Sequence, residues 1–188
     1  EATDLGKLQQ AWAGGVDVRL RLSGEAEGGA ASPSAWPLVS VLVRSMNRQV
    51  LARALDSVAL QAYPNLEVVV VAGCVGHDRL PDSWGGVGVR LIETDAPVPR
   101  SRAANQALHH ARGELLLFLD DDDWLLPDHI GRLANALSKL PGHGAAYTGV
   151  ALVDTNGQPT GQAFDLPFDR VRLSAGNLMP IHAVMFRA

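Results

Sequence analysis

The sequence alternates apolar runs of strand length with segments of helical periodicity, and this alternation is the feature that most constrains its fold. The strand-length runs occupy residues 38–43, 66–72, 87–92 and 114–119. The helical patterns occupy residues 49–61, 101–112 and 127–140. Parallel strands need crossover connections, which are usually helices. The sequence therefore predicts an α/β fold with a mainly parallel sheet flanked by helices, and ligands at the carboxyl ends of the strands.

The remaining segments set the expected domain limits. The sequence predicts a short helix at 5–12 and a half-buried strand at 16–22, before a stretch rich in Gly, Ala, Ser and Pro. We therefore predict an N-terminal leader and linker over residues 1–36 and a single domain over 37–188. Within the domain, Gly113 is expected to terminate the helix at 101–112. Later strands are expected at 145–153 and 183–186.

Composition excludes several classes of protein. The net charge is −4 and no basic stripe is present, so a nucleic-acid partner is not expected. No apolar run approaches the ~20 residues of a membrane-spanning helix, whereas peripheral association with a membrane stays open. Cys74 is the single cysteine, which excludes an internal disulfide. A reducing, cytoplasmic location fits this composition.

Four consecutive aspartates, Asp120 to Asp123, follow directly after the apolar run at 114–119. Adjacent carboxylates repel one another, so this cluster predicts a cation nearby. Mn²⁺ or Mg²⁺ suits such oxygen ligands and keeps open positions for substrate phosphates. The alternative is structural, because Asp123 or Asp128 could cap a helix that begins near Pro127. Capping does not require four acids, and we therefore favour metal or diphosphate binding.

The segments around this cluster resemble family-2 inverting glycosyltransferases with the GT-A fold, a Rossmann-like nucleotide-diphospho-sugar transferase fold. RGELLLFLDDDDWLLPDHI resembles the family's acidic DXD region, and SRAANQALHHARGE resembles the helix before it. VSVLVRSMNRQVLARALDSVALQAYPNLEVVVV resembles the first strand, turn, helix and second strand. NLMPIHAVMFR resembles a later stretch on the acceptor side. These segments occur in the family's order and span residues 38–187.

The resemblance assigns candidate site residues by position. It implies that the nucleotide sugar is bound by Arg44, Ser45, Asn47, Ala72, Arg100, Arg102, Asn105, Asp120 and Asp121. It implies that the metal ion is held by Asp122, Asp120 and His182. The alternative for the two arginines on the helix is a solvated surface position, and for His182 it is a hydrogen-bonded place in the core. Trp124 is expected to pack under the acidic loop in preference to stacking on a sugar.

Two features depart from the family pattern. The positions that usually carry a pair of aspartates at the end of the second strand, one of which reads the nucleobase, hold Ala72 and Gly73. Base recognition then falls to the main chain, to His77 or Asp78, or to a donor whose base is not uracil. The acid that deprotonates the acceptor is expected beyond Ala188. Asp165 and Asp169 are internal substitutes that we interpret as surface acids.

The predicted function is metal-dependent transfer of a sugar, with inversion, from a nucleotide-diphosphate sugar to a carbohydrate or other hydroxyl acceptor. The alternative is a non-catalytic nucleotide-sugar-binding or scaffolding domain of a larger protein. A phosphatase of the haloacid dehalogenase type also places acids after a strand, but it normally requires Thr or Val where this chain has Trp124. A Rossmann dehydrogenase is disfavoured because the turn at 44–47 contains no glycine.

Overall fold

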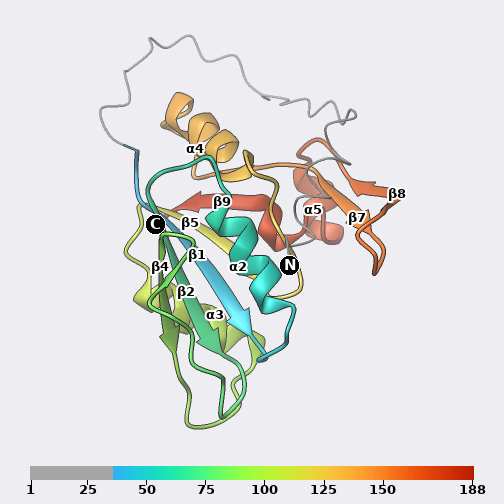
Figure 1. Cartoon of the computed structure of the whole chain (residues 1–188). Coiled ribbons are helices and arrows are strands. Elements are labelled where there is room, and N and C mark those ends of the chain that lie inside the picture. The colour runs from blue at the N-terminus through green and yellow to red at the C-terminus, as the bar shows by residue number, and fades with distance from the viewer. Residues whose placement is uncertain (1–35) are drawn as a thin grey trace.

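The computed structural model describes residues 36–188, which form a seven-stranded sheet covered by helices on both faces, with a separate two-stranded sheet beside it (Figure 1). The strand order is β3-β4-β2-β1-β5-β9-β6. β1, β2, β4 and β5 run parallel, and β6 runs with them because it is antiparallel to β9. The strands are β1 Val39–Ser45, β2 Leu66–Ala72, β3 Ser83–Trp84, β4 Val87–Ile92, β5 Leu115–Asp120, β6 Ala145–Tyr147 and β9 Val184–Arg187. This topology confirms the predicted mainly parallel α/β fold.

The central strands β1, β2 and β5 are buried on both faces, as their largely apolar sequences predict. β1 lies between β2 and β5, with Val41 opposite Val68 on one side and Leu117 on the other. Helix α3, Arg100–His110, packs against β1 and β2 on one face of the sheet. Helices α2, Leu51–Ala59, and α4, His129–Lys139, contribute their apolar sides to the core on the other face.

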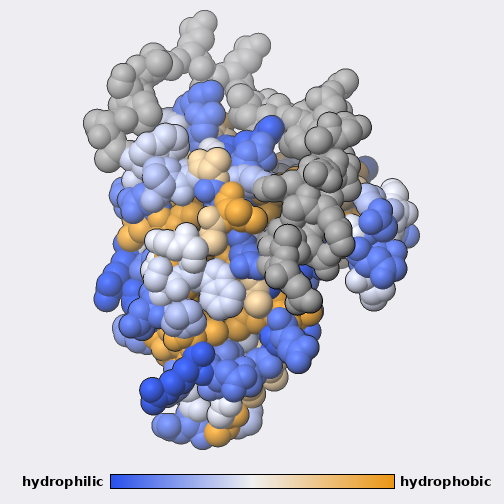
Figure 2. Space-filling model, viewed as in Figure 1, coloured by the Kyte–Doolittle hydropathy of each residue, from blue (hydrophilic) through white to orange (hydrophobic). Residues whose placement is uncertain are grey.

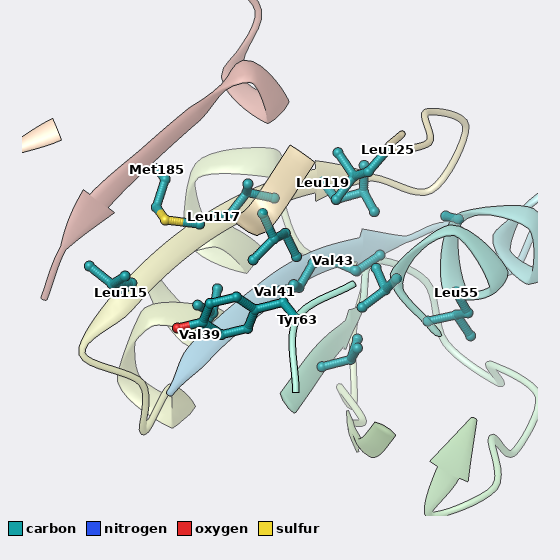
Figure 3. Close-up of a cluster of buried hydrophobic side chains, with 14 of the residues drawn as sticks. Val39, Val41, Val43, Leu55, Tyr63, Leu115, Leu117, Leu119, Leu125 and Met185 are labelled. Atoms are coloured by element: carbon teal, nitrogen blue, oxygen red, sulfur yellow. The ribbon is translucent and has the colours of Figure 1, made fainter. Parts of the chain in front are cut away.

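Two layers of core side chains follow from the alternation along β1. Val39, Val41 and Val43 belong to the larger cluster together with Leu55 of α2 (Figure 3). Helix α4 adds Ile130, Leu133 and Leu137 to the same cluster. Leu42 points to the opposite face and meets Ala103 of α3 in a smaller cluster. Because successive residues of a strand point to opposite faces, β1 packs into both layers. This packing holds the carboxyl end of β1 in place.

Several predicted boundaries differ from the structure. α3 ends at His110, so Gly113 does not terminate it. The expected strand at 145–153 is two strands in different sheets, β6 and β7, Val150–Val153. β7 pairs with β8, Pro159–Phe164, which the sequence did not predict because its polar residues are all exposed. A short helix α5, Arg170–Ala175, and the 3-10 turn Ile181–Ala183 complete the chain before β9.

The expected helix at 5–12, strand at 16–22 and most of the leader and linker lie outside the described residues. Within residues 36–188, no helix combines the length and apolar character needed to span a membrane. On the face shown in Figure 2, hydrophobic residues reach the surface over the middle of the domain and hydrophilic residues surround them. Apolar side chains at the surface include Trp36, Val50 and Leu60, and scattered exposure of this kind is normal.

Candidate functional site

The acidic cluster lies at the carboxyl edge of the sheet, next to the turn that follows β1. Asp120 is the last residue of β5 and stands opposite Arg44 of β1 in the parallel register. Asp121, Asp122 and Asp123 leave the strand at this point and form a loop that we call the acidic loop, residues 121–123. The predicted placement of the cluster at the carboxyl end of a central strand is thus observed.

Buried polar side chains of α2 and of the turn that follows it, Ser57 and Gln61, hold the chain directly after the acidic loop. The Ser57 hydroxyl accepts a hydrogen bond from the Leu125 amide at 3.1 Å. Nε2 of Gln61 donates to the Leu126 carbonyl at 2.7 Å, and Oε1 accepts from the Ile130 amide at 3.0 Å. Buried hydrogen bonds of this kind define one arrangement of the backbone. The acidic loop is therefore fixed at both of its ends, by β5 on one side and by Ser57 and Gln61 on the other.

Asp121 joins the acidic loop to the turn after β1. Its side chain is only 1% exposed, and its Oδ2 accepts a hydrogen bond from the Met46 amide at 2.8 Å. The Arg48 guanidinium forms an ion pair with the same carboxylate. A buried carboxylate needs such partners, because an unpaired buried charge is strongly destabilising. Arg48 is not among the predicted site residues, because residue types alone do not pair a turn residue with an acid 73 positions away.

Asp122 and Asp123 face a cavity of about 500 Å³ between the acidic loop, α2, α4 and β7. Asp122 is 51% exposed, and its Oδ2 accepts a hydrogen bond from Nη1 of Arg48 at 2.9 Å. Oδ2 of Asp123 lies 2.9 Å from Nδ1 of His182, which enters from the turn before β9. We call this space the acidic cavity, since Asp122, Asp123 and His182 all line it.

Asp120 faces a different cavity of about 560 Å³ on the α3 side of the sheet. Arg44 and Arg100 line this cavity together with Asp120, and we call it the basic cavity. Nη2 of Arg100 lies 3.5 Å from Oδ2 of Asp120. Burial raises the pKa of Asp120, and the charge of Arg100 acts in the opposite direction. Ala103, Ala104 and Ala107 present small side chains there, which leaves the space open.

The predicted metal ligands are divided between the two cavities. Asp122 and His182 line the acidic cavity, whereas Asp120 lines the basic one. Among residues 36–188, no three His, Cys, Asp or Glu side chains are grouped so that they could hold a metal ion. The structure therefore does not assemble Asp120, Asp122 and His182 as one ligand set. The reason is local, because the chain leaves β5 after Asp120 and the alternation of the strand no longer applies.

Two residues predicted to bind the nucleotide, Ser45 and Asn47, make hydrogen bonds that stabilise the turn after β1. Ser45 is fully buried, and its hydroxyl accepts from the Asn47 amide at 3.1 Å and contacts Nε2 of His77 at 2.7 Å. Asn47 adopts a left-handed φ of 59°, and its side-chain oxygen accepts from the Asp78 amide at 3.1 Å. Contacts of Ser45 and Asn47 with a nucleotide stay predictions.

The end of β2 is closely packed where the family pattern usually has aspartates. Ala72 is 1% exposed, and its carbonyl accepts a hydrogen bond from Thr94 at 3.0 Å. A β-carbon on Gly73 would stand 2.6 Å from Sδ of Met46. Both ring nitrogens of His77 already have partners within 2.7 Å. Of the two side chains considered for base recognition, Asp78 is thus the better placed to meet a ligand.

The polar residues predicted on α3 do not line the same cavity. Arg100 lines the basic cavity, whereas Arg102 and Asn105 are exposed and line neither of the two cavities described. The helical spacing explains this division, because residues two or five positions after Arg100 point to other sides of the helix. A direct role for Arg102 or Asn105 in binding the donor stays a prediction.

Other candidates have structural partners. The Arg53 guanidinium lies 3.5 Å from the centre of the Trp124 ring, so one face of that ring is covered by a cation. Asp169 caps α5, because its Oδ1 accepts from the Val171 and Arg172 amides. Asp169 is thus a helix cap.

His129 stands at the first turn of α4 and lines the acidic cavity. Burial lowers its pKa to about 4, so the ring is neutral at pH 7. An unfolded histidine has a pKa near 6.5. Between about pH 4 and 6.5 the unfolded chain therefore binds a proton that the folded protein does not, and stability rises with pH across this range.

Between pH 7 and pH 4.5 we expect both the wild-type protein and the His129→Gln variant to lose unfolding free energy. The loss should be larger in the wild type, by about 1 to 3 kcal/mol. Urea unfolding at the two pH values measures the difference, and the titration of other groups cancels between the two proteins. Equal losses in both proteins would show that His129 does not titrate as its burial requires.

Comparison with known proteins agrees with this fold. The sequence model described as Glycosyl transferase family 2 matches residues 40–178. The chain is 30% identical over 116 residues to the putative colanic acid biosynthesis glycosyl transferase WcaA of Escherichia coli, which is 59% of this chain and 42% of that protein. It is 31% identical over 133 residues to a Campylobacter jejuni GalNAc(5)-diNAcBac-PP-undecaprenol beta-1,3-glucosyltransferase, which is 64% of this chain and 40% of that protein.

Solved structures share the fold. S. aureus TarS 1–349 superposes with a TM-score of 0.57 at 18% identity, over 80% of this chain and 47% of that one. The mannosyltransferase PcManGT from Pyrobaculum calidifontis, solved in complex with GDP-Man and Mn²⁺, gives a TM-score of 0.52 at 23% identity, over 97% of this chain and 51% of that one. The chain spans less than half the length of each of the two sequence relatives described above. With its GT-A sheet and a family match over most of its length, the chain belongs to glycosyl transferase family 2.

Proposed function

We propose that this domain binds a nucleotide-diphosphate sugar at the carboxyl edge of the sheet and takes part in transferring the sugar, with inversion, to a hydroxyl acceptor. The observation that carries the proposal is the pair of cavities on either side of the cluster Asp120 to Asp123. One cavity offers arginines and the other offers carboxylates with a histidine. A donor that combines an anionic diphosphate with a metal ion needs both kinds of group.

The basic cavity suits the anionic part of the donor. Arg44 and Arg100 approach it from β1 and from the first turn of α3. Guanidinium groups bind phosphate oxygens well, and amide groups at a helix N-terminus also favour anions. α3 has no side-chain cap, which leaves its first amides available. We assign direct donor contacts to Arg44, Arg100 and Asp120. The residues that would support the site from behind are Ser45, Asn47, Ala72 and Asp121. Arg102 and Asn105 are the more distant candidates.

The acidic cavity suits a divalent cation. The side chains of Asp122, Asp123 and His182 carry oxygen and nitrogen ligands that Mn²⁺ accepts, and Mg²⁺ accepts the oxygens. As observed, Asp122 is paired with Arg48 and His182 is paired with Asp123, so these two residues could meet one ion only after both contacts open. We propose Asp122 and His182 as ligands, with Asp120 acting from the neighbouring cavity. Bound there, the ion would neutralise the negative charge that develops on the departing diphosphate.

The residues of this chain would orient the donor and exclude water around it. Inversion follows from one displacement, in which the acceptor oxygen attacks the anomeric carbon as the bond to the diphosphate breaks. This step requires a base within hydrogen-bond reach of the acceptor proton. We also propose a cytoplasmic location, in which the thiol of Cys74 would stay reduced.

A binding or scaffolding domain without turnover is the second candidate. One observation favours it, because the Asp169 carboxylate is engaged as a helix cap and is not presented to either cavity. Release of nucleoside diphosphate from a nucleotide sugar, measured with this chain and an added hydroxyl acceptor, separates the candidates. Turnover supports the enzyme, and tight binding without turnover supports the binding domain.

Thermal unfolding in the presence of UDP, GDP, dTDP, CDP or ADP, each with Mn²⁺ or with EDTA, tests donor binding. A ligand at about 100 times its dissociation constant adds about 2.7 kcal/mol to the stability of the folded protein. For a chain of this size we expect one nucleotide to raise Tm by about 5 to 10 °C with Mn²⁺ and far less with EDTA. No shift with any nucleotide at millimolar concentration would refute the proposed function.

A further inference from the structure

Arg48 reaches two consecutive aspartates of the acidic loop from the turn after β1. One side of its guanidinium pairs with the Asp121 carboxylate through Nη2 and Nε. Nη1 donates to Oδ2 of Asp122 at 2.9 Å. The planar fork of arginine allows this double contact, which a single ammonium group could not reproduce. Arg48 thus supplies the positive charge that lets two adjacent carboxylates lie side by side.

The two contacts differ in strength because the two carboxylates differ in burial. Asp121 is 1% exposed, so its separation from Arg48 would leave a buried charge without a counter-ion. Asp122 is 51% exposed and Arg48 is 46% exposed, and an exposed ion pair contributes little to stability. The ion pair between Arg48 and Asp121 should therefore persist, whereas another cation can take the place of Arg48 at Asp122.

We propose that Arg48 is a positioning residue that occupies Asp122 until a divalent cation replaces it there, while its contact with Asp121 persists. This inference rests on the proposed use of a metal ion. Asp121 also accepts the Met46 amide, so the exchange leaves the turn after β1 in place. The domain can then keep the acidic loop in one shape both before and after the cation enters.

The exchange makes Arg48 a competitor of the metal ion. A guanidinium and a divalent cation that share one carboxylate repel each other, and partial exposure to solvent weakens this repulsion without abolishing it. Removing the guanidinium without disturbing Asp121 should therefore raise the affinity for Mn²⁺ about 3- to 10-fold. A purely structural role for Arg48 predicts the opposite change, because a looser acidic loop would bind the ion less well.

The test compares two variants that both lack the buried Asp121 charge, and only one of them also lacks the Arg48 guanidinium. Asp121→Asn keeps an oxygen that can accept the Met46 amide, and it makes the loss of Arg48 tolerable. Binding of Mn²⁺ without nucleotide, followed by the electron paramagnetic resonance of the free ion, compares this variant with the double variant Arg48→Gln/Asp121→Asn. We expect the double variant to bind about 3- to 10-fold more tightly than Asp121→Asn. Equal or weaker binding would overturn the proposal.

A second variant keeps the native Asp121. Arg48→Lys retains a positive charge for the buried carboxylate but cannot reach both aspartates, and we expect Mn²⁺ to bind about twofold or more tightly than to wild type. Unchanged or weaker binding counts against the proposal. Arg172→Gln removes a charge from α5 and should leave Mn²⁺ affinity unchanged. If the wild-type protein binds no Mn²⁺, the proposed metal site fails too, whereas wild-type binding with no change in the Arg48 variants refutes only the role of Arg48.

Discussion

Replacing Asp122 with alanine should lower the Mn²⁺-dependent affinity for a nucleoside diphosphate by about 100-fold or more, while the fold survives. Asp122 combines the exposure and the position that a metal ligand needs, since it lines the acidic cavity beside His182. A hundredfold change corresponds to about 2.7 kcal/mol of binding free energy. Its contact with Arg48 is half-exposed, so its loss should cost less than about 1 kcal/mol of stability.

The measurement is calorimetric titration of the nucleotide identified by thermal unfolding, with Mn²⁺ present. Asp82→Ala is the matched control, because Asp82 is an exposed acid in the loop before β3 and lines neither cavity. The control should bind like the wild type. Unchanged nucleotide affinity in Asp122→Ala would exclude Asp122 as the metal ligand.

Gly113→Ala should destabilise the protein by about 2 to 3 kcal/mol and lower Tm by about 4 to 12 °C. A β-carbon at this position would stand 2.6 Å from the Ser40 amide nitrogen and 2.7 Å from the Leu38 carbonyl oxygen. Both atoms belong to the backbone at the start of the central strand and cannot move as a flexible side chain could. The Gly113 amide also donates to the Ser40 hydroxyl at 2.8 Å, and the collision would distort this contact.

Gly131→Ala provides the contrast. Gly131 lies within α4, and the nearest atom to an added β-carbon is the Ala62 carbonyl oxygen at 4.0 Å. Alanine there should stabilise the helix by about 0.5 to 1 kcal/mol. Thermal unfolding of both variants checks the pair of predictions. A Gly113→Ala protein as stable as the wild type would show that the strand and the turn at Gly113 are not in close contact.

Gly113 also illustrates what a single sequence can reveal about this fold. Its position after a helical pattern predicts a helix terminus, but α3 ends at His110 and the glycine is required by a contact with β1. Local patterns carry information about neighbours in sequence. A close approach between segments that lie some 70 residues apart leaves no periodic trace.

The strands that the sequence predicted well are those that burial dictates. Most residues of β1, β2 and β5 are buried, whereas β4, nearer the edge of the sheet, buries only Val89. β8 was missed because none of its residues is buried, and its Thr, Gly and Gln show no alternation of polarity. Hydrophobic periodicity therefore identifies the core of the domain and not its exposed hairpin.

The site was predicted in location but not in detail. The acids follow an apolar strand, and this order places them at the carboxyl edge of the sheet. Which cavity each carboxylate faces depends on where the chain leaves β5, and only the structure separates Asp120 from Asp122. The partner of Asp121, Arg48, lies 73 residues away in the sequence, and ion pairs at such a distance are not legible from residue types alone.

The central claim is that a divalent cation at the acidic loop joins this domain to the diphosphate of a sugar donor. Calorimetric titration of the wild-type protein with the selected nucleoside diphosphate, once with Mn²⁺ and once with EDTA, tests it most directly. We predict saturable binding to one site with Mn²⁺ and an affinity at least about tenfold lower with EDTA. Equal affinity under both conditions, or no binding under either, would contradict the claim.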